Sequence, residues 1–471
     1  MQMLIAGSWV DGVDKIPVNN PYNNEEIDTV PRASADDIER ALAYASEGAS
    51  VIRKISGYDR YHILMRAAKL MDERLEDFAR TLTMEEGKVI GEARLEVSRA
   101  AETIIGSAEE AKRLGSEVVP LDGAPGTGNR LGFTLRVPCG VVLAITPFNF
   151  PLNLVCHKVG PAIAGGNSVI LKPATDTPLV ALKFTQLLLD AGLPPQAIQC
   201  VTGSGGQIGD ILCSDPRVRK ITFTGSRDVG ERICHSAGIK KVTMELGSNA
   251  PVIILPDADL EKAANAIAIT GYANAGQVCI SAQRILIHSA VYGDLIDALQ
   301  PKVDKLTTGD PLDEATKVGP MVRESDAARV AEWIQEAAGQ GARLLGGGER
   351  QGAMLTPSIL ADVTPEMKVS ADEVFGPTVG LTSVGSVDEA IELANQSNYG
   401  LSAAIFTENL DHAMRFAREV DSGNLHINWG SQWRADLMPY GGLKDSGFGK
   451  EGPKYAVQEM TETKMVVMHL P

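Results

Sequence analysis

The sequence predicts an α/β fold with two domains, each formed by a parallel sheet that helices cover. From Gly140 onward, short apolar runs alternate with longer stretches of helical periodicity, the pattern of buried parallel strands joined by helices. The same alternation returns at Pro251 and continues to about Gly442. The length of 471 residues suits roughly three domains, so both domains and a smaller part can be accommodated.

The amino-terminal segment is predicted to contain one short strand followed by a set of helices. Leu4 to Val10 alternates apolar and polar residues and then meets Asp11-Gly12, a turn signal. From Ser34 to about Leu114 apolar residues recur at spacings of three and four, which indicates amphipathic helices. Ser34 precedes two aspartates and is the expected cap of the first helix.

A loop and an isolated strand are expected between Pro120 and Pro138. The loop is rich in glycine, and Arg130 to Arg136 then carries apolar residues at alternate positions. Such a strand has little local core to join. Alternation alone leaves two interpretations, an arm that pairs at an open sheet edge or an ordinary surface hairpin.

The strands of the two α/β domains are predicted from the apolar runs. The runs before the expected boundary at Leu246-Gly247 are 141–145, 168–171, 197–201 and 220–223. The runs after it are 252–255, 284–288, 379–384 and 402–406.

Charge and composition exclude several classes of function. A net charge of −16 and a pI of about 5.0 argue against binding to nucleic acid or to an anionic membrane. The first residues do not resemble a signal peptide, and no window approaches the roughly 18 apolar residues that span a bilayer, so a cytoplasmic protein is expected. The six cysteines and seven histidines lack metal-ligand spacing, which predicts reduced thiols and no metal.

Three segments carry residues suited to covalent catalysis: Asn149 in Thr-Pro-Phe-Asn-Phe-Pro, Glu245 in Met-Glu-Leu-Gly-Ser-Asn-Ala-Pro, and Cys279 in Gly-Gln-Val-Cys-Ile-Ser. Beside Val278 and Ile280, a cysteine alone is more often a small buried hydrophobe than a nucleophile. Four further segments occur in the same order as in one family, and they are Leu171–Ala174, Phe223–Ser226, Glu373–Pro377 and Met438–Gly442. Together these segments resemble the aldehyde dehydrogenase family over nearly the whole chain.

The resemblance implies the aldehyde dehydrogenase-like fold, with two Rossmann-like domains and a β-strand oligomerisation arm. It places the dinucleotide-binding domain at 1–119 and 139–246 and the catalytic domain at 247–447. The arm would comprise 120–138 and 448–471, with the strand near residues 130–136 pairing with one around Lys464 to His469. It also implies self-association as a dimer or tetramer.

A nicotinamide cofactor site is expected at the carboxyl ends of the first sheet. Gly225 to Gly230 follows a predicted strand and opens a helix whose free amides can meet a pyrophosphate, whereas Gly203 to Gly209 is a weaker match to a dinucleotide fingerprint. By resemblance, Lys172 contacts the adenosine ribose and Glu373 the nicotinamide ribose. The cofactor-binding candidates are Thr146, Pro147, Phe148, Lys172, Ala174, Thr175, Gly205, Gly209, Phe223, Thr224, Gly225, Ser226, Gly230, Leu246, Gly247, Glu373 and Phe375.

Thr175 bears on the choice between NAD and NADP. Members that prefer NAD commonly have a glutamate three residues after the lysine, where it repels the additional phosphate of NADP. Thr175 carries no such charge, and Lys172 is available to pair with a phosphate. We expect NADP to be accepted and NAD to be used as well.

The resemblance assigns a role to each residue of the catalytic set. Cys279 attacks an aldehyde, Asn149 and the Cys279 backbone amide stabilise the oxyanion, and hydride transfer leaves a thioester. Glu245 then activates water, which favours release of a free acid over transfer to coenzyme A. A member that acylates coenzyme A and a non-catalytic member are the alternatives that this set disfavours.

The substrate is expected to be a small hydroxylated or anionic aldehyde. The segment after Asn149 resembles members that oxidise lactaldehyde-like substrates, and His157 and Arg434 are the polar candidates for contacting the substrate. A guanidinium can bind a carboxylate, phosphate or sulfonate through two hydrogen bonds, although Arg434 could equally pair with Asp436 or another acid. Val278 stands where several relatives acting on phosphorylated or phosphonylated aldehydes have arginine, which argues against glyceraldehyde 3-phosphate and phosphonoacetaldehyde as substrates. Semialdehydes and sulfonated or phosphorylated aldehydes remain alternatives.

Overall fold

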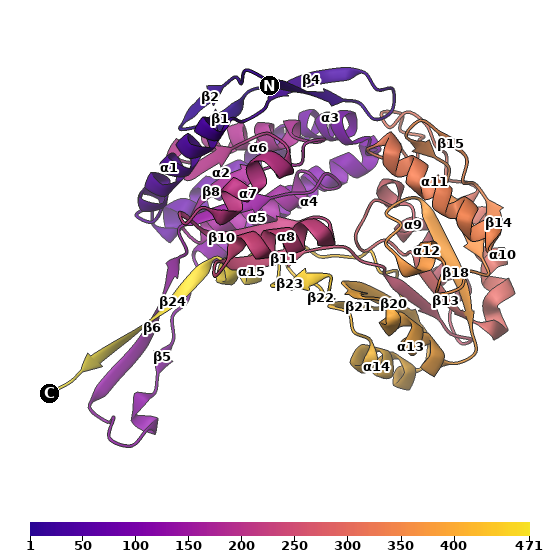
Figure 1. Ribbon diagram of the computed structural model, residues 1–471. Coiled ribbons are helices and arrows are strands. Elements are labelled where there is room, and N and C mark those ends of the chain that lie inside the picture. Colours follow the sequence, from indigo (N-terminus) through magenta and orange to yellow (C-terminus); the bar gives the residue numbers. More distant parts are fainter.

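The computed structural model describes residues 1–471 and confirms the α/β class. Figure 1 shows two sheet-and-helix parts, with a long arm of β-strands that projects from the first. The first sheet has eight strands in the order β2-β1-β9-β8-β7-β10-β11-β23, and the second has seven in the order β14-β17-β18-β13-β12-β20-β21.

The central strands of the first sheet run parallel. The sheet contains β1 (Met3–Ile5), β2 (Ser8–Val10), β7 (Val141–Ile145), β8 (Ser168–Lys172), β9 (Ile198–Cys200), β10 (Val218–Thr224), β11 (Lys241–Glu245) and β23 (Gly447–Phe448). Its helices are α1 (Ala35–Ile52), α2 (Gly57–Glu73), α3 (Leu75–Glu86), α4 (Ile90–Ala111), α5 (Asn153–Ala164), α6 (Leu179–Asp190), α7 (Asp210–Ser214), α8 (Arg227–Ala237) and α15 (Pro453–Glu459). The predicted set of helices after Ser34 and the four predicted strands of this domain are confirmed.

The second sheet is parallel except at the edge formed by β14. It contains β12 (Pro251–Ile254), β13 (Arg284–His288), β14 (Arg343–Gly346), β17 (Ser358–Ala361), β18 (Thr378–Val384), β20 (Ser402–Phe406) and β21 (Asn424–Ile427). Its helices are α9 (Leu260–Thr270), α10 (Tyr292–Val303), α11 (Glu324–Gly339), α12 (Lys368–Ala371), α13 (Val387–Gln396) and α14 (Leu410–Glu419). The four strands predicted here are also confirmed.

Short paired strands complete the body of the molecule. They are β3 (Lys15–Asn19) with β4 (Glu26–Pro31), β15 (Arg350–Gln351) with β16 (Met354–Leu355), and β19 (Tyr399–Gly400) with β22 (Leu443–Lys444).

The amino terminus differs from its prediction. Leu4 to Val10 forms two antiparallel strands, β1 and β2, instead of one. Ala6 and Gly7 make the turn with φ values of 51° and 77°. Alanine seldom adopts this left-handed conformation, so the alternating sequence concealed the turn. The cap at Ser34 is confirmed: its hydroxyl oxygen accepts the backbone N–H of Asp37 at 3.2 Å.

The predicted pairing of the arm is confirmed, but its start is not. Strand β6 (Arg130–Pro138) pairs with β24 (Thr461–His469) along its whole length, and β5 (Val118–Val119) adds a short third strand. Residues 448–460, expected in the arm, lie with the first domain: Phe448 pairs with Met244, and α15 packs against α4 and α5. Apolar residues of α15 prefer that core to the solvent around the arm, so the strand begins at Thr461.

The strand register gathers the carboxyl ends of the first sheet. Ile145 lies beside Lys172 and Phe223, and Thr224 lies beside Glu245. The residues that end these strands therefore share one edge, where open α/β sheets bind ligands.

Candidate active site

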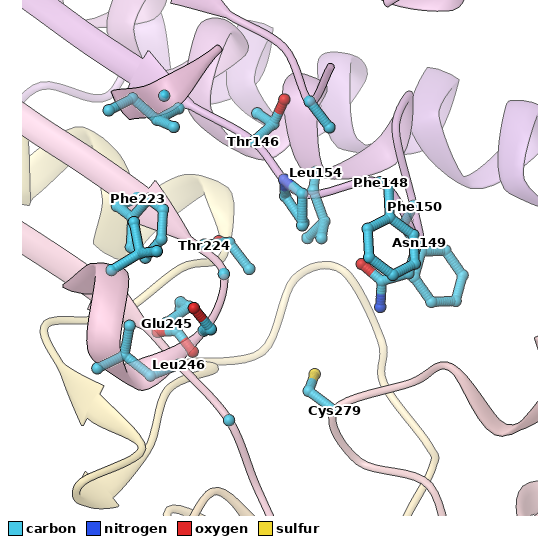
Figure 2. A pocket seen from close by; sticks show the side chains of 18 of the residues that line it. Thr146, Phe148, Asn149, Phe150, Leu154, Phe223, Thr224, Glu245, Leu246 and Cys279 are labelled. Atoms are coloured by element: carbon cyan, nitrogen blue, oxygen red, sulfur yellow. The ribbon is translucent and has the colours of Figure 1, made fainter. Parts of the chain in front are cut away.

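A cavity of about 700 Å³ lies at this edge, between the two domains. Figure 2 shows Asn149, Glu245 and Cys279 on three separate segments around it. All the predicted catalytic residues line the cavity, as does Arg434. Of the predicted cofactor residues, all but Gly230 line it. A Cβ atom at Gly230 would lie 2.5 Å from Leu246 Cδ2, so this glycine lets α8 pack closely against the segment after Glu245.

The loop that carries Cys279 has an unusual backbone. Asn274, Ala275 and Gly276 have φ values of 51°, 53° and 70°. A Cβ atom at Gly276 would lie 2.0 Å from the carbonyl oxygen of Gly376, so glycine is needed there. The loop leaves Cys279 partly accessible, with its Sγ atom 3.3 Å from Tyr440 Oη. Burial raises the pKa of this thiol to about 12, and the hydrogen bond with Tyr440 opposes that shift.

Asn149 is held by hydrogen bonds to its side chain and to its backbone. Its Nδ2 donates to the carbonyl of Gln277 at 2.8 Å, which leaves the second N–H of the amide available. Its backbone carbonyl accepts from Lys88 Nζ at 2.8 Å and from Asn274 Nδ2 at 3.0 Å. The amide therefore lies beside the nucleophile loop in a fixed position.

Glu245 ends β11 and projects into a buried environment. Neither carboxyl oxygen has a hydrogen-bond partner. Burial raises the pKa of Glu245 well above its usual value, and the negative charge of Glu451 adds to the effect. A carboxyl group in such surroundings is suited to taking a proton near neutral pH.

A second group of charges lies behind the catalytic residues. Glu451 accepts hydrogen bonds from Lys158 at 2.7 Å and Arg434 at 3.0 Å. Burial acts to raise the pKa of Glu451, but these two cations outweigh it and hold the pKa below its usual range. The Arg434 guanidinium stacks on Tyr440, 3.9 Å from the ring centroid, and its Nε has no hydrogen-bond partner.

Arg434 thus has the acidic partner that the alternative interpretation anticipated, but the partner is Glu451. The Nε atom of Arg434 lies 3.9 Å from Asp436 Oδ1, which is a looser contact. His157 does not line the cavity, in contrast to the expected contact with substrate. It is buried behind Arg434, with Nε2 2.9 Å from Asp436 Oδ1 and 3.0 Å from Arg434 Nη2.

The other end of the cavity has features that fit a dinucleotide. Helix α8 begins after Ser226 without a side-chain cap, so its first N–H groups are free for an anion. A Cβ atom at Gly205 or Gly209 would meet nothing within 4 Å, which leaves an open path along that wall. The buried hydroxyl of Thr146 lacks a partner. The free N–H groups suit a pyrophosphate, and the open space and the unpaired hydroxyl suit the riboses of a dinucleotide.

The charged residues predicted for the cofactor lie at opposite ends of this region. Burial lowers the pKa of Lys172 to about 8, and its Nζ donates to the carbonyl of Pro173 at 3.1 Å. Glu373 accepts the backbone N–H of Ser248 at 2.8 Å, and burial raises its pKa to about 7. Thr175 donates to the Gly203 carbonyl at 3.4 Å.

Among the cavity residues that were not predicted, two bear on the chemistry. Tyr440 lay within the quoted segment Met438–Gly442, but nothing local indicated contact with a cysteine 161 positions away. Arg99 lies on α4 and pairs with Asp436 through Nε at 3.1 Å and Nη2 at 2.9 Å. The helical pattern of the sequence around Arg99 indicates only that this residue lies on the polar face of its helix.

Two features of the structure bear on other classes of function. No group of three or more histidine, cysteine, aspartate or glutamate side chains is arranged to hold a metal ion. None of the helices combines the length and the apolar character that crossing a membrane requires.

Comparison with known proteins establishes the class. A model of the aldehyde dehydrogenase family matches residues 9–466. The 3-sulfolactaldehyde dehydrogenase of Priestia megaterium is 49% identical over 468 residues, which cover 99% of this chain and 98% of that protein. The lactaldehyde dehydrogenase of Methanococcus aeolicus is 38% identical over 471 residues, 99% of this chain and 100% of that protein.

A solved structure agrees closely over the whole chain. It is the NADP-dependent glyceraldehyde-3-phosphate dehydrogenase of Bacillus halodurans complexed with NADP, with a TM-score of 0.98 and 36% identity. The match covers 100% of this chain and 99% of that one. The chain therefore belongs to the aldehyde dehydrogenase family. It is an oxidoreductase that oxidises small aldehydes with NAD or NADP as the hydride acceptor.

Proposed function

We propose that the protein oxidises a short hydroxyaldehyde that bears an anionic group, with 3-sulfolactaldehyde as the foremost candidate. The observation that carries this proposal is the placement of Arg434. This guanidinium lines the cavity, stacks on the tyrosine that contacts Cys279, and retains an Nε–H without a hydrogen-bond partner. The name of the relative that is 49% identical supports the sulfonated substrate, since a guanidinium suits a sulfonate as well as a carboxylate.

In this proposal Arg434 contacts the anionic group, and Arg99 supplies a second positive charge on the same wall. Arg99 is partly accessible, with a side-chain exposure of 30%. His157 is assigned to positioning Arg434, because it lies behind that residue and away from the cavity wall.

The covalent chemistry begins at Cys279. Its thiolate sulfur forms a bond to the aldehyde carbon, and the carbonyl oxygen becomes an oxyanion. The free N–H of the Asn149 amide and the backbone N–H of Cys279 donate to that oxyanion. An oxidised nicotinamide held by Lys172, Glu373 and the free end of α8 would supply the hydride acceptor that this carbon needs to become a thioester.

Glu245 completes the cycle. Its carboxylate takes a proton from water, whose oxygen bonds to the thioester carbon while the bond to Cys279 breaks. The products are the carboxylic acid and the restored thiolate. A buried carboxyl with no other partner supports this role over transfer to coenzyme A.

We assign the cofactor to the wall formed by the free end of α8, Lys172 and Glu373. When bound, the cofactor supplies the hydride acceptor. The open wall at Gly205 and the absence of a negative charge at Thr175 support use of NADP alongside NAD. The domain division into 1–119 with 139–246, and 247–447, belongs to this proposal as well.

We further propose that the arm mediates self-association, as a dimer or tetramer. Strand β24 is an edge of the arm sheet, and its exposed apolar residues include Met465, Val467 and Met468. Removal of residues 461–471 would then lower the mass measured by sedimentation, whereas an unchanged mass would reject the role of the arm in self-association.

A reducing, cytoplasmic setting fits six cysteines that are all unpaired.

The test of substrate class compares two aldehydes in one variant. Arg434→Met should lower the ratio of kcat/KM for 3-sulfolactaldehyde to kcat/KM for lactaldehyde by about 10- to 100-fold, the value of a charge-assisted hydrogen bond. Because the ratio is used, general damage to catalysis cancels. Arg343→Met, which removes an exposed pair with Asp362, is the control. An unchanged ratio in Arg434→Met would remove Arg434 from substrate recognition.

A further inference from the structure

We propose that the Tyr440 hydroxyl is a catalytic hydrogen-bond donor to the Cys279 thiolate. Tyr440 Oη lies 3.3 Å from Sγ, and either atom could donate while the thiol is neutral. A thiolate has no proton to give, so the hydroxyl must donate once Cys279 ionises. The inference rests on the proposed role of Cys279 as the nucleophile.

The surroundings of Cys279 otherwise disfavour its ionised form. Burial raises the pKa of the thiol, and the charges of Glu373 and Glu245 act in the same direction. Two groups oppose them: the hydrogen bond from Tyr440 and the more distant charge of Arg434. Tyr440 is thus the polar side chain in direct contact with the sulfur that favours its ionised form.

Tyr440 is well suited to remain a donor. It is 3% exposed, and burial raises the pKa of its phenol well above the usual value, so the hydroxyl keeps its proton at working pH. The Arg434 guanidinium lies 3.9 Å from the ring centroid. A cation on the face of the ring draws electron density from it, which makes the phenolic O–H a stronger donor.

The backbone fixes the geometry of this pair. The N–H of Tyr440 donates to the carbonyl of Glu451 at 3.2 Å, and the N–H of Glu451 donates back at 2.7 Å. The side chain of Glu451 holds Arg434 at 3.0 Å. Tyr440, Arg434 and Glu451 therefore form one rigid group that faces Cys279.

The hydrogen bond would act at two points of the cycle. It stabilises the thiolate before attack, and it stabilises the same thiolate as the leaving group when water attacks the thioester. Between these points the sulfur is bonded to carbon and is a weak acceptor. Loss of this hydrogen bond should therefore slow both acylation and deacylation.

Tyr440→Phe tests the proposal, because it removes the hydroxyl and keeps the ring under Arg434. Alkylation of Cys279 by iodoacetamide would be followed on the Cys279 peptide by mass spectrometry, at a fixed pH below the thiol pKa. A charge-assisted hydrogen bond shifts the pKa by about one to two units, and a more basic thiolate reacts faster, so a net fall of about 3- to 10-fold is expected.

Controls separate this effect from loss of structure. Cys156 and Cys200 are fully buried and should stay unlabelled if the variant folds. Tyr292→Phe removes a hydroxyl that contacts Asp362, away from the cavity, and should leave the alkylation of Cys279 unchanged. An unchanged alkylation rate in folded Tyr440→Phe would overturn the inference.

A third variant separates the inference from the proposed function. Cys279→Ala should lack aldehyde oxidation. If it is inactive while Tyr440→Phe alkylates normally, only the role of Tyr440 fails. If Cys279→Ala remains active, the nucleophile itself is wrong and the inference falls with it.

Discussion

Lys88 Nζ lies 2.8 Å from the backbone carbonyl oxygen of Asn149, inside the protein and next to the catalytic loop. The same ammonium forms ion pairs with Glu86 at 3.1 Å and with Glu96. Glu96 accepts the backbone N–H groups of Leu152 and Asn153, both at 3.0 Å. One buried cation and its carboxylates thus fix the middle of the loop that presents the Asn149 amide and its junction with α5.

Lys88→Met should therefore cost both stability and activity. It leaves Glu86 and Glu96 without their cation in a buried site, a change that typically costs about 3 to 5 kcal/mol. Chemical denaturation would measure the loss. Lys112→Met removes an exposed ion pair with Glu109 and should change the free energy of unfolding by less than about 1 kcal/mol. Equal stability of the two variants would contradict the importance of the buried charge.

Glu245→Gln should separate acylation from deacylation. The first turnover should still produce reduced cofactor, because hydride transfer precedes the step that needs a base. Steady turnover should slow by roughly 100- to 10,000-fold, the usual contribution of a general base. Rapid-mixing absorbance measurements distinguish the two phases. Loss of the initial burst would mean that Glu245 acts before hydride transfer.

The pH dependence of steady turnover should follow Glu245. The carboxyl must be ionised to accept a proton, and burial raises its pKa above the usual value. Activity should therefore be low at acidic pH and rise as pH passes through this raised pKa. The comparison is the kcat profile of the wild type with that of Glu245→Gln, which should lack the rising limb. If kcat of Glu245→Gln still rises at the same pH, another group causes the rise.

Thr175→Glu should shift the choice of cofactor toward NAD. The new carboxylate would repel the additional phosphate of NADP and offer an acceptor to the ribose of NAD. The ratio of kcat/KM for NADP to kcat/KM for NAD should fall by roughly tenfold or more. Thr175→Val removes the bond to the Gly203 carbonyl without adding charge, and it serves as the control. An unchanged ratio in Thr175→Glu would contradict the electrostatic explanation.

The sequence was sufficient to predict the four central strands of each main sheet, because their apolar runs are buried on both faces, but it did not indicate β14, β17, β21 or β23. It did not indicate β11, although that strand presents Glu245. Lys241 to Glu245 contains only two apolar residues and looks like a polar connection. Its place in the sheet depends on pairing with β10 and β23, which are distant partners that a local pattern does not contain.

The candidate site could be predicted as a set of residues, but its internal contacts could not. Motifs identified Cys279, Glu245, Asn149 and Arg434, and all four line one cavity. The contact between Cys279 and Tyr440, and the pairing of Arg434 with Glu451, join segments that only the folded chain brings together. The position of His157 behind Arg434 likewise depends on how α5 packs.

In the proposed mechanism, Cys279 forms the covalent bond to the aldehyde. The most direct measurement is reduced-cofactor formation by Cys279→Ala with 3-sulfolactaldehyde and lactaldehyde, together with the affinity for NADP. Cys279→Ala should show no detectable oxidation of either aldehyde and unchanged NADP binding, because the sulfur is removed while the cofactor wall is intact. Oxidation at the wild-type rate would rule out Cys279 as the nucleophile.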